Sequence, residues 1–489
     1  MRNKKNENFS EWFTEIIQKA ELADIRYNVK GFIVFRPWSV ITMEIMYDLY
    51  EKELQDKGHK PAWFPVLIPE SNFLLEAEHV EGFAPEVFWV TEHGAGEKLE
   101  EKLALRPTSE TAMYKMYSLW IQGASDLPLK IYQRGSVYRR ETKATRPFLR
   151  SREFFWIEAH NCFATEKKAK KQVKEDMKIT EKVVHNQFCI PFIAFQRPEW
   201  DKFPGAVHTY AVDTLMPDGK VIQQPSTHFL GQNFSKPFDI TFQDEKGEKR
   251  YVWQTCYGPA ISRIYASVIS ILGDDHGLRF PFVLAPIQII IVPIYTDENK
   301  DKIIKYCSKI KKRLKNYRVE IDISDNTPGF KFNEWEMKGV PLRLEIGPKE
   351  AEAEAVTIVT RTTKEKETIQ FKDIKKAVKS KGKEITNYLK QEADKAFENI
   401  IHDAKTMDEL KKALERGGFV RVPLCSIKMK GKDCADNIKA ETYGDIRGIR
   451  FGKKEKPEPG ATCIFCGKQA KHIVYVAKQY LSLIHISEP

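Results

Sequence analysis

One stretch of the sequence, Arg150–His160, alternates two kinds of side chain and so limits what the chain around it can form. Because successive side chains of a β-strand point to opposite faces, an extended conformation separates the two kinds. One face carries charged and aromatic groups, namely Arg150, Arg152, Phe154, Trp156, Glu158 and His160. The other face is apolar, with Phe155, Ile157 and Ala159. Half-buried charges need partners, so we interpret the stretch as a strand with a functional site on one face.

Composition narrows the class of protein. With 489 residues, 42% of them hydrophobic, the chain can bury a large core and form roughly two to four domains. We find no apolar run of the roughly 18–20 residues that a membrane span needs and no apolar signal core in Met1–Glu11. Eight cysteines are too few for a disulfide scaffold of this length, so we expect a reducing, cytoplasmic setting. The net charge of +11 favours a nucleic-acid partner, although a basic solvated surface is an alternative.

Three blocks follow one another along the chain. Residues 1–285 predict an α+β domain, with a helix at Ile41–Lys57 and a strand at Lys130–Gln133. Residues 286–385 alternate strands with a charged helix, which is typical of a small α/β domain. Within this block we expect a loop around Gly329 and Gly339, and we interpret Lys364–Lys381 as solvated surface or linker. From about residue 386 a helical stretch, 384–415, leads into a cysteine-bearing segment that ends near residue 480.

Three shorter segments also carry chemistry. Arg106–Thr111 offers a carboxylate and hydroxyls that can bind an ammonium group, or it caps the helix expected at Ala112–Leu119. Gln223–His228 brings amide, hydroxyl and imidazole groups together, or it is an ordinary polar turn. Gly258–Arg263 opens an apolar helix in which Arg263 needs an anion, either a phosphate or a structural partner.

These segments, in this order, resemble the three motifs of class II aminoacyl-tRNA synthetases, and in detail the prolyl-tRNA synthetases of the archaeal and eukaryotic type. Motif 1 is the 41–57 helix with the strand at 65–67, motif 2 is 138–158, and motif 3 is 258–263. The resemblance implies an antiparallel-sheet catalytic domain in 1–285, an α/β anticodon-binding domain in 286–385 and a zinc-binding α+β domain in 386–480. It also implies a homodimer through motif 1. The short interval between Glu158 and Gln223 leaves no room for the bacterial editing insertion, and we expect no such domain.

The resemblance further implies that the protein ligates L-proline to tRNA(Pro) through a prolyl-adenylate, using ATP and Mg²⁺. The catalytic residues it implies are Arg139, Glu141 and Arg263. The ATP-binding residues are Arg139, Glu141, Arg150, Ser151, Phe154, Gln223, Ser226, Ser262 and Arg263. The proline-binding residues are Thr108, Glu110, Arg139, Trp156, Glu158, His160 and His228. The anticodon-binding residues are Glu336, Arg343 and Lys349. Two details depart from the family pattern: Ser226-Thr227 stands where Thr-Ser is more frequent, and the spacing of motif 3 is closer to that of bacterial relatives.

Four cysteines gather near the carboxyl end. Cys463-Ile-Phe-Cys466 is a good half-site for Zn²⁺, because two intervening residues let one turn present both sulfurs. Cys425 and Cys434 are spaced more widely, but the family carries a similar four-cysteine site, so we expect structural zinc there. Reduced core cysteines, or His472 as a substitute ligand, are the alternatives. Residues 481–489 follow the tyrosine at which the family usually ends, and their origin is unknown.

Two other functions stay open at this point. A different class IIa synthetase, such as one for threonine, would share the motifs but differ at 108–110 and 156–160. A non-catalytic RNA-binding paralogue would be expected to lose Arg139 or Arg263, and the sequence has both.

Overall fold

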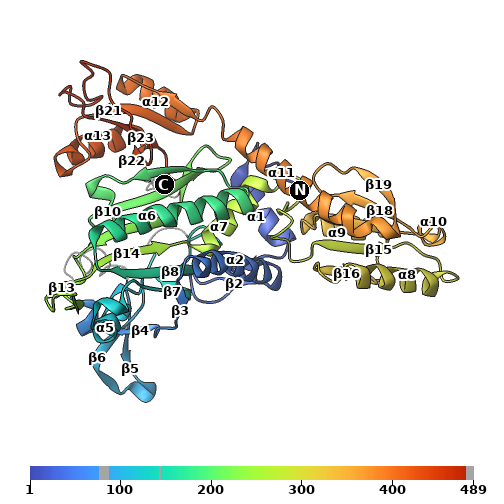
Figure 1. The fold of residues 1–489 in the computed structure, drawn as a ribbon. Helices are drawn as coiled ribbons and strands as arrows, with labels where there is room; N and C mark the ends of the chain where they lie inside the picture. The colour runs from blue at the N-terminus through green and yellow to red at the C-terminus, as the bar shows by residue number, and fades with distance from the viewer. Residues whose placement is uncertain (76–86, 142–144, 481–489) are drawn as a thin grey trace.

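Three domains follow one another along the chain in the computed structural model, which describes residues 1–75, 87–141 and 145–480 (Figure 1). The middle domain projects to one side of the first, whereas the last domain lies against the sheet of the first. The tail at 481–489 lies outside the described residues. In the part of the chain that is described, no helix combines the length and apolar character that crossing a bilayer requires.

The first domain is built on an antiparallel sheet with the order β9-β10-β11-β14-β8-β7, to which β3 adds a short parallel strand. Its strands are β3 (Lys60–Pro61), β7 (Leu129–Tyr138), β8 (Glu153–Phe163), β9 (Ile193–Gln196), β10 (His208–Leu215), β11 (Val221–Gly231) and β14 (Trp253–Gly258). Strand β8 lies in the middle, paired with β7 on one side and β14 on the other. The alternating stretch is therefore a strand, but it begins at Glu153, so the predicted face is wrong for Arg150 and Arg152, which lie before it. Arg150 instead forms an isolated bridge with Arg146.

Helices cover both faces of this sheet. Helices α2 (Pro37–Asp56), α6 (Glu166–Thr180) and α7 (Ile261–Ser267) pack with the apolar residues Ile157 and Ala159 of β8. Helix α2 begins four residues before the predicted start because Pro37 suits the first helical position. On the opposite face, α5 (Glu110–Trp120) buries Tyr114 and Tyr117 against Cys162 and Cys256.

Smaller elements complete the first domain. They are α1 (Phe9–Lys19), β1 (Ala23–Asp24), β2 (Val34–Phe35), β4 (Leu67–Pro69), α3 (Glu70–Phe73), β5 (Phe88–Glu92), β6 (Lys98–Leu105), β12 (Thr241–Gln243) and β13 (Lys249–Tyr251).

The middle domain is a five-stranded mixed sheet with the order β16-β15-β17-β18-β19. Its elements are β15 (Ile289–Pro293), α8 (Lys300–Arg313), β16 (Val319–Ile321), α9 (Pro328–Met337), β17 (Leu342–Ile346), α10 (Pro348–Glu352), β18 (Ala355–Thr360) and β19 (Lys366–Gln370). The loop expected around Gly329 is wrong, because α9 begins there, with the Thr327 hydroxyl accepting from the amide of Phe330. The segment interpreted as surface or linker, 364–381, contains β19 and the start of a long helix.

The last domain begins after that helix, α11 (Ile374–Ala396), which runs through position 385 without a break. The continuous helical stretch expected to residue 415 is wrong, since β20 (Ile401–Asp403) separates α11 from α12 (Met407–Glu415). The remaining elements are β21 (Phe419–Leu424), α13 (Lys432–Thr442), β22 (Asp445–Arg450) and β23 (His472–Ala477).

The sheets of the first and last domains are joined into one. Strand β22 pairs with β9, with Ile449 opposite Gln196 and Arg450 opposite Phe195. Gly448 allows β22 to lie this close to β9. Its φ is +119°, and a Cβ there would lie 2.0 Å from the carbonyl oxygen of Gln196. A side chain at this position would therefore have to displace backbone.

We predict that Gly448→Ala lowers the thermal unfolding temperature, at a cost of at least about 1–3 kcal/mol from overpacking. Gly452→Ala is the matched control, because Gly452 also has a positive φ but a Cβ there would meet no atom within 4 Å. The control should show only the backbone cost of about 1 kcal/mol. Equal shifts in the two variants, measured by calorimetry, would contradict the close approach.

Candidate functional site

A cavity of about 190 Å³ lies over the chemical face of β8. Eleven residues singled out from the sequence line it: Thr108, Glu110, Arg139, Phe154, Trp156, Glu158, His160, Gln223, Ser226, His228 and Arg263. Four others, Glu141, Arg150, Ser151 and Ser262, are not in its lining. The hydroxyls of Ser151 and Ser262 donate to backbone carbonyls, those of Glu153 and Phe155. The structure thus brings separate segments of the sequence to one place.

Glu158 is the centre of a buried hydrogen-bond network. Its carboxylate accepts from the hydroxyl and amide of Ser109, and from Nε2 of Gln133 at 2.8 Å. Nε2 of His160 lies 3.2 Å from the same carboxylate, while its Nδ1 is hydrogen-bonded to the Tyr114 hydroxyl at 3.0 Å. Burying a carboxylate costs several kcal/mol, which bonds of about 1.5–3 kcal/mol each can offset. Glu158 is therefore held as a fixed anion.

The ionisation of this pair follows from its surroundings. Burial raises the pKa of Glu158, but the hydrogen bond and charge of His160, with Ser109 and Arg106, outweigh it and leave the pKa lowered. Burial lowers the pKa of His160, but Glu110 and Glu158 outweigh it and leave the pKa raised. Together with Glu110, the pair keeps this part of the cavity suited to a bound cation.

His228, unlike His160, is held in its neutral form. Its ring is hydrogen-bonded to the hydroxyls of Thr209 (2.9 Å) and Ser226 (3.1 Å), and the Phe203 ring packs over it with the ring centres 4.6 Å apart. Burial, with the nearby charges of His160 and Arg197, lowers the pKa of His228 to about 3. The imidazole is neutral at physiological pH and forms a flat wall.

The Ser226-Thr227 pair is explained by the alternation of β11. Ser226 faces the cavity, whereas the Thr227 hydroxyl donates to the buried carboxylate of Asp176 in α6 at 2.7 Å. Asp176 also accepts from Nε2 of Gln172 at 2.7 Å. Burial raises the pKa of Asp176 to about 7, although both hydrogen bonds oppose this.

Arginines form a second group in the cavity. The Arg139 guanidinium lies 5.3 Å from the ring centre of Phe154 and 5.7 Å from that of Trp156. Nη1 of Arg263 lies 3.5 Å from the carbonyl oxygen of Gln223. Burial, with the charges of Arg139 and Arg150, lowers the pKa of Arg263 to about 10, and Glu141 opposes the shift. Clustered arginines at a cavity wall favour a polyanion.

Sequence reasoning missed part of the lining. The missed residues are Asp201, Lys202, Phe203, Thr209, Cys256 and Tyr257, whereas Gln224, Gly258 and Ala260 lie within the predicted segments 223–228 and 258–263 but had no role assigned. Those at 201–203 lie in the connection between β9 and β10, where no periodicity marks them. Tyr114, which supports His160, is hidden in the apolar stripe of α5.

A second cavity, of about 220 Å³, lies in the middle domain. Glu336 and Arg343 line it, and Lys349 lies outside its lining in α10. Nζ of Lys364 is 2.9 Å from Glu336, and Nη2 of Arg343 donates to Glu345 at 2.9 Å. The Arg343 guanidinium stacks 4.0 Å from the ring centre of Phe332. Trp335, which lines the cavity, gives this polar pocket an aromatic side.

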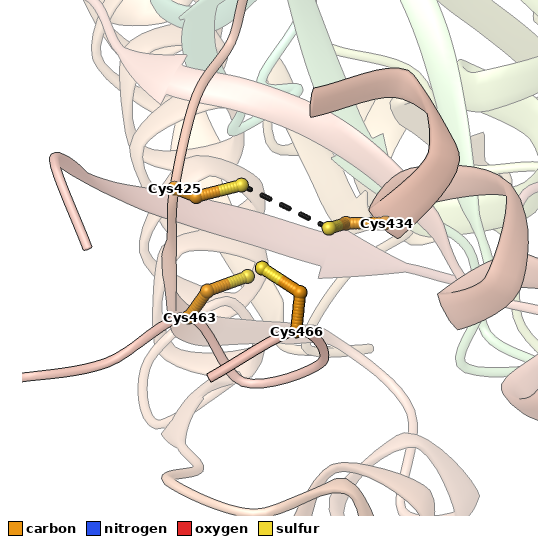
Figure 2. Close-up of side chains that lie close together, drawn as sticks. All are labelled: Cys425, Cys434, Cys463 and Cys466. Atoms are coloured by element: carbon orange, nitrogen blue, oxygen red, sulfur yellow. Dashed lines mark hydrogen bonds between the residues drawn. The ribbon is translucent and has the colours of Figure 1, made fainter. Parts of the chain in front are cut away.

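The four carboxyl-terminal cysteines converge (Figure 2). Cys425 follows β21, Cys434 lies in the first turn of α13, and Cys463 and Cys466 come from the connection before β23. Their sulfurs all lie within 4.8 Å of one another, and His472 is not part of the group. The Sγ atoms of Cys425 and Cys434 are 3.8 Å apart. A hydrogen bond from the Lys468 amide leads the effects that lower the pKa of Cys466 to about 7.

Comparison with known families matches each domain separately. Residues 88–272 match the tRNA synthetase class II core domain (G, H, P, S and T), and residues 288–381 match the anticodon binding domain. Residues 407–480 match the carboxyl-terminal domain of prolyl-tRNA synthetase.

Relatives match over the whole length. The proline–tRNA ligase of Thermofilum pendens is 49% identical, over 97% of this chain and 98% of its own. That of Pyrococcus abyssi is 40% identical, over 98% of this chain and 99% of its own. A solved structure of Giardia lamblia prolyl-tRNA synthetase in complex with prolyl-adenylate superposes with a TM-score of 0.92 at 35% identity, covering 98% of this chain and 99% of that one.

The buried Asp176 predicts a pH-dependent stability. Its folded pKa is raised, so as pH rises above about 4 the unfolded chain loses this proton first, and stability falls until about pH 7. Asp176→Asn removes this loss. Between pH 4 and pH 8 the free energy of unfolding of the variant should therefore rise relative to that of the wild type by up to about 4 kcal/mol. Urea unfolding at both pH values measures the gain. The exposed Asp56→Asn should gain nothing, and a pH-independent difference for Asp176→Asn would contradict the assignment.

Proposed function

This chain belongs to the prolyl-tRNA synthetases of class II, and we propose that the cavity over β8 is its active site. The enzyme is a proline–tRNA ligase. It activates L-proline with ATP to a prolyl-adenylate, releasing diphosphate, and transfers the prolyl group to tRNA, releasing AMP.

The observation that carries the site assignment is the pairing of an anionic and a cationic group in one cavity. Joining a carboxylate to the α-phosphate of ATP brings two anions together, so the protein must neutralise and align them. Arg139 is the residue between the two groups: it contacts the rings of Phe154 and Trp156, and its Nε donates to the Pro107 carbonyl next to Thr108. We assign Arg139 to bridging the proline carboxylate and the α-phosphate.

Proline would occupy the part of the cavity near Glu110. The Thr108 hydroxyl donates to this carboxylate at 2.5 Å, and the two groups offer acceptors for the secondary ammonium. Trp156 and the neutral His228 supply flat walls for a rigid ring, while Glu158 and His160 hold the pocket in place. No protein base is needed when the tRNA hydroxyl attacks the adenylate.

ATP would occupy the arginine side. Arg150 and Arg263 would hold the phosphates, Phe154 would stack on adenine, and Gln223, Ser226, Ser151 and Ser262 are assigned to the nucleotide from the family pattern. The Glu141 carboxylate lies 2.7 Å from Nε of Arg150, which orients an oxygen of the kind that Mg²⁺ prefers. When bound with ATP, Mg²⁺ offsets the phosphate charge.

We assign the second cavity to the anticodon. Glu336 and Arg343 line it, and the fork of Arg343 suits the edge of guanine, whereas Lys349 would act from its rim. Single-stranded bases can enter such a pocket because their edges and faces are free.

We propose that the four cysteines bind one structural Zn²⁺. Tetrahedral Zn–S bonds of about 2.3 Å require sulfurs about 3.8 Å apart, and the Cys425–Cys434 distance meets this requirement. Four thiolates would close the coordination shell, so the metal would connect β21, α13 and the 463–466 turn without taking part in catalysis.

We also propose a homodimer working in the cytoplasm. The first domain division is placed at 285, and the second, expected at 385, is moved to the end of α11, because this helix is continuous through position 385. Large apolar side chains in the motif 1 region are exposed, among them Trp63 (77%), Ile41 and Leu67. An exposed apolar patch of this kind favours a protein partner. None of the eight cysteines forms a disulfide, which is consistent with a reducing compartment.

Pyrophosphate exchange with each of the twenty amino acids tests the function, and two variants separate its sites. Proline should lead the exchange, and Arg139→Ala should reduce it at least about 100-fold, since a charge contact at the reacting groups is lost. Arg343→Ala should leave exchange intact but impair tRNA charging. Exchange led by threonine, or equal loss in both assays for Arg343→Ala, would contradict these assignments.

Metal analysis tests the zinc site. The purified protein should hold one Zn²⁺ per chain, and Cys434→Ser should lose it and unfold at a lower temperature, because a structural metal contributes directly to folding. Cys307→Ser is the control, since Cys307 is buried in the middle domain, away from the cluster. Full zinc content in Cys434→Ser would refute the site.

A further inference from the structure

One side chain of the last domain enters the buried interior of the first. Arg447, in β22, is 2% exposed and donates from Nε to Oδ2 of Asp213 at 2.8 Å and from Nη2 to Oδ1 at 3.2 Å. Asp213, in β10, is fully buried. The close approach at Gly448 brings this arginine to the junction of the two sheets.

The same carboxylate also holds a second arginine. Arg197 donates from Nη1 to Oδ2 of Asp213 at 2.8 Å and from Nη2 to Oδ1 at 2.6 Å. Nη1 also donates to the backbone carbonyl of Arg447 at 2.8 Å. Two guanidiniums thus share one carboxylate, and Asp201 lies 3.8–3.9 Å from both arginines.

This cluster ends at a residue of the active-site cavity. Nη2 of Arg197 donates to the side-chain oxygen of Gln223 at 3.1 Å, and Gln223 faces Asp213 across the β10–β11 pair. The amide oxygen of Gln223 is thereby held, which leaves its NH₂ group to be presented in a fixed orientation. Asp201, at the other end of the cluster, lines the same cavity.

We propose that Arg447 is a positioning residue for ATP: by sharing Asp213 with Arg197, it keeps the Arg197 guanidinium where it orients Gln223. Without Arg447, Asp213 keeps only Arg197 to neutralise it and is left with unfilled acceptor positions, which a buried carboxylate tolerates poorly. Nε of Arg197 is buried without a hydrogen-bond partner among the described residues, so the guanidinium can turn to offer this donor to Asp213. Nη2, which serves both Asp213 and Gln223, would then leave Gln223. The proposal rests on the assignment of Gln223 to the nucleotide.

Pyrophosphate exchange with the full-length enzyme tests the proposal, since it yields KM values for ATP and for proline without tRNA. Arg447→Met should raise KM for ATP about fivefold, the effect of losing one hydrogen bond, and leave KM for proline within twofold. Arg447→Lys keeps the charge without the fork and should rescue only in part. Arg421→Met is the matched control, because Arg421 pairs with Asp403 on the surface of the same domain.

A double-mutant cycle separates positioning from simple domain attachment. If Arg447 acts through Gln223, then Arg447→Met should add nothing to the ATP effect of Gln223→Ala. Additive effects, or an Arg447→Met defect in proline KM alone, would overturn the proposal, as would an unchanged ATP KM in Arg447→Met. An unchanged ATP KM in Gln223→Ala would overturn the nucleotide assignment itself. If Arg447→Met does not fold, the same cycle with Arg447→Lys decides between these outcomes.

Discussion

Pairing of β8 along both of its edges holds the site together. The ladders to β7 and β14 fix its register, and a slip of one residue would turn Glu158 and His160 into the core and Ile157 towards the cavity. The apolar face packs under α2 and α7, so such a slip would expose the core at the same time. The hydrophobic effect that folds the domain therefore also aims its charged groups.

Charges inside the first domain come in groups that satisfy one another. Glu158 is surrounded by donors, and Asp213 lies between two arginines. Burial and the positive charge of Arg139 both lower the pKa of Arg263, so an anion bound beside these two arginines would be favoured. The arginine side of the cavity is thus where a bound phosphate would be most stabilising.

The sequence allowed the parts of this enzyme with a local signature to be predicted. Strand β8 has a period of two, and its chemical face follows from that period alone. Helix α9 is mistaken for a loop when Gly329 is given more weight than Pro328, although proline in a first turn favours a helix. The contact between Arg447 and Asp213 could not be predicted, since nothing local couples residues so far apart in the chain.

The shared sheet also constrains the order in which the protein can be made. Strand β9 leaves the ribosome early, but its partner β22 belongs to the last domain to be synthesised. Until then the edge of the first sheet carries unpaired amide and carbonyl groups, which invite pairing with other nascent chains. The middle domain can fold during this interval, whereas the pairing of β9 with β22 can form only after β22 has been synthesised. Completion of the chain, rather than folding of the first domain, is then the event that closes its aggregation-prone edge.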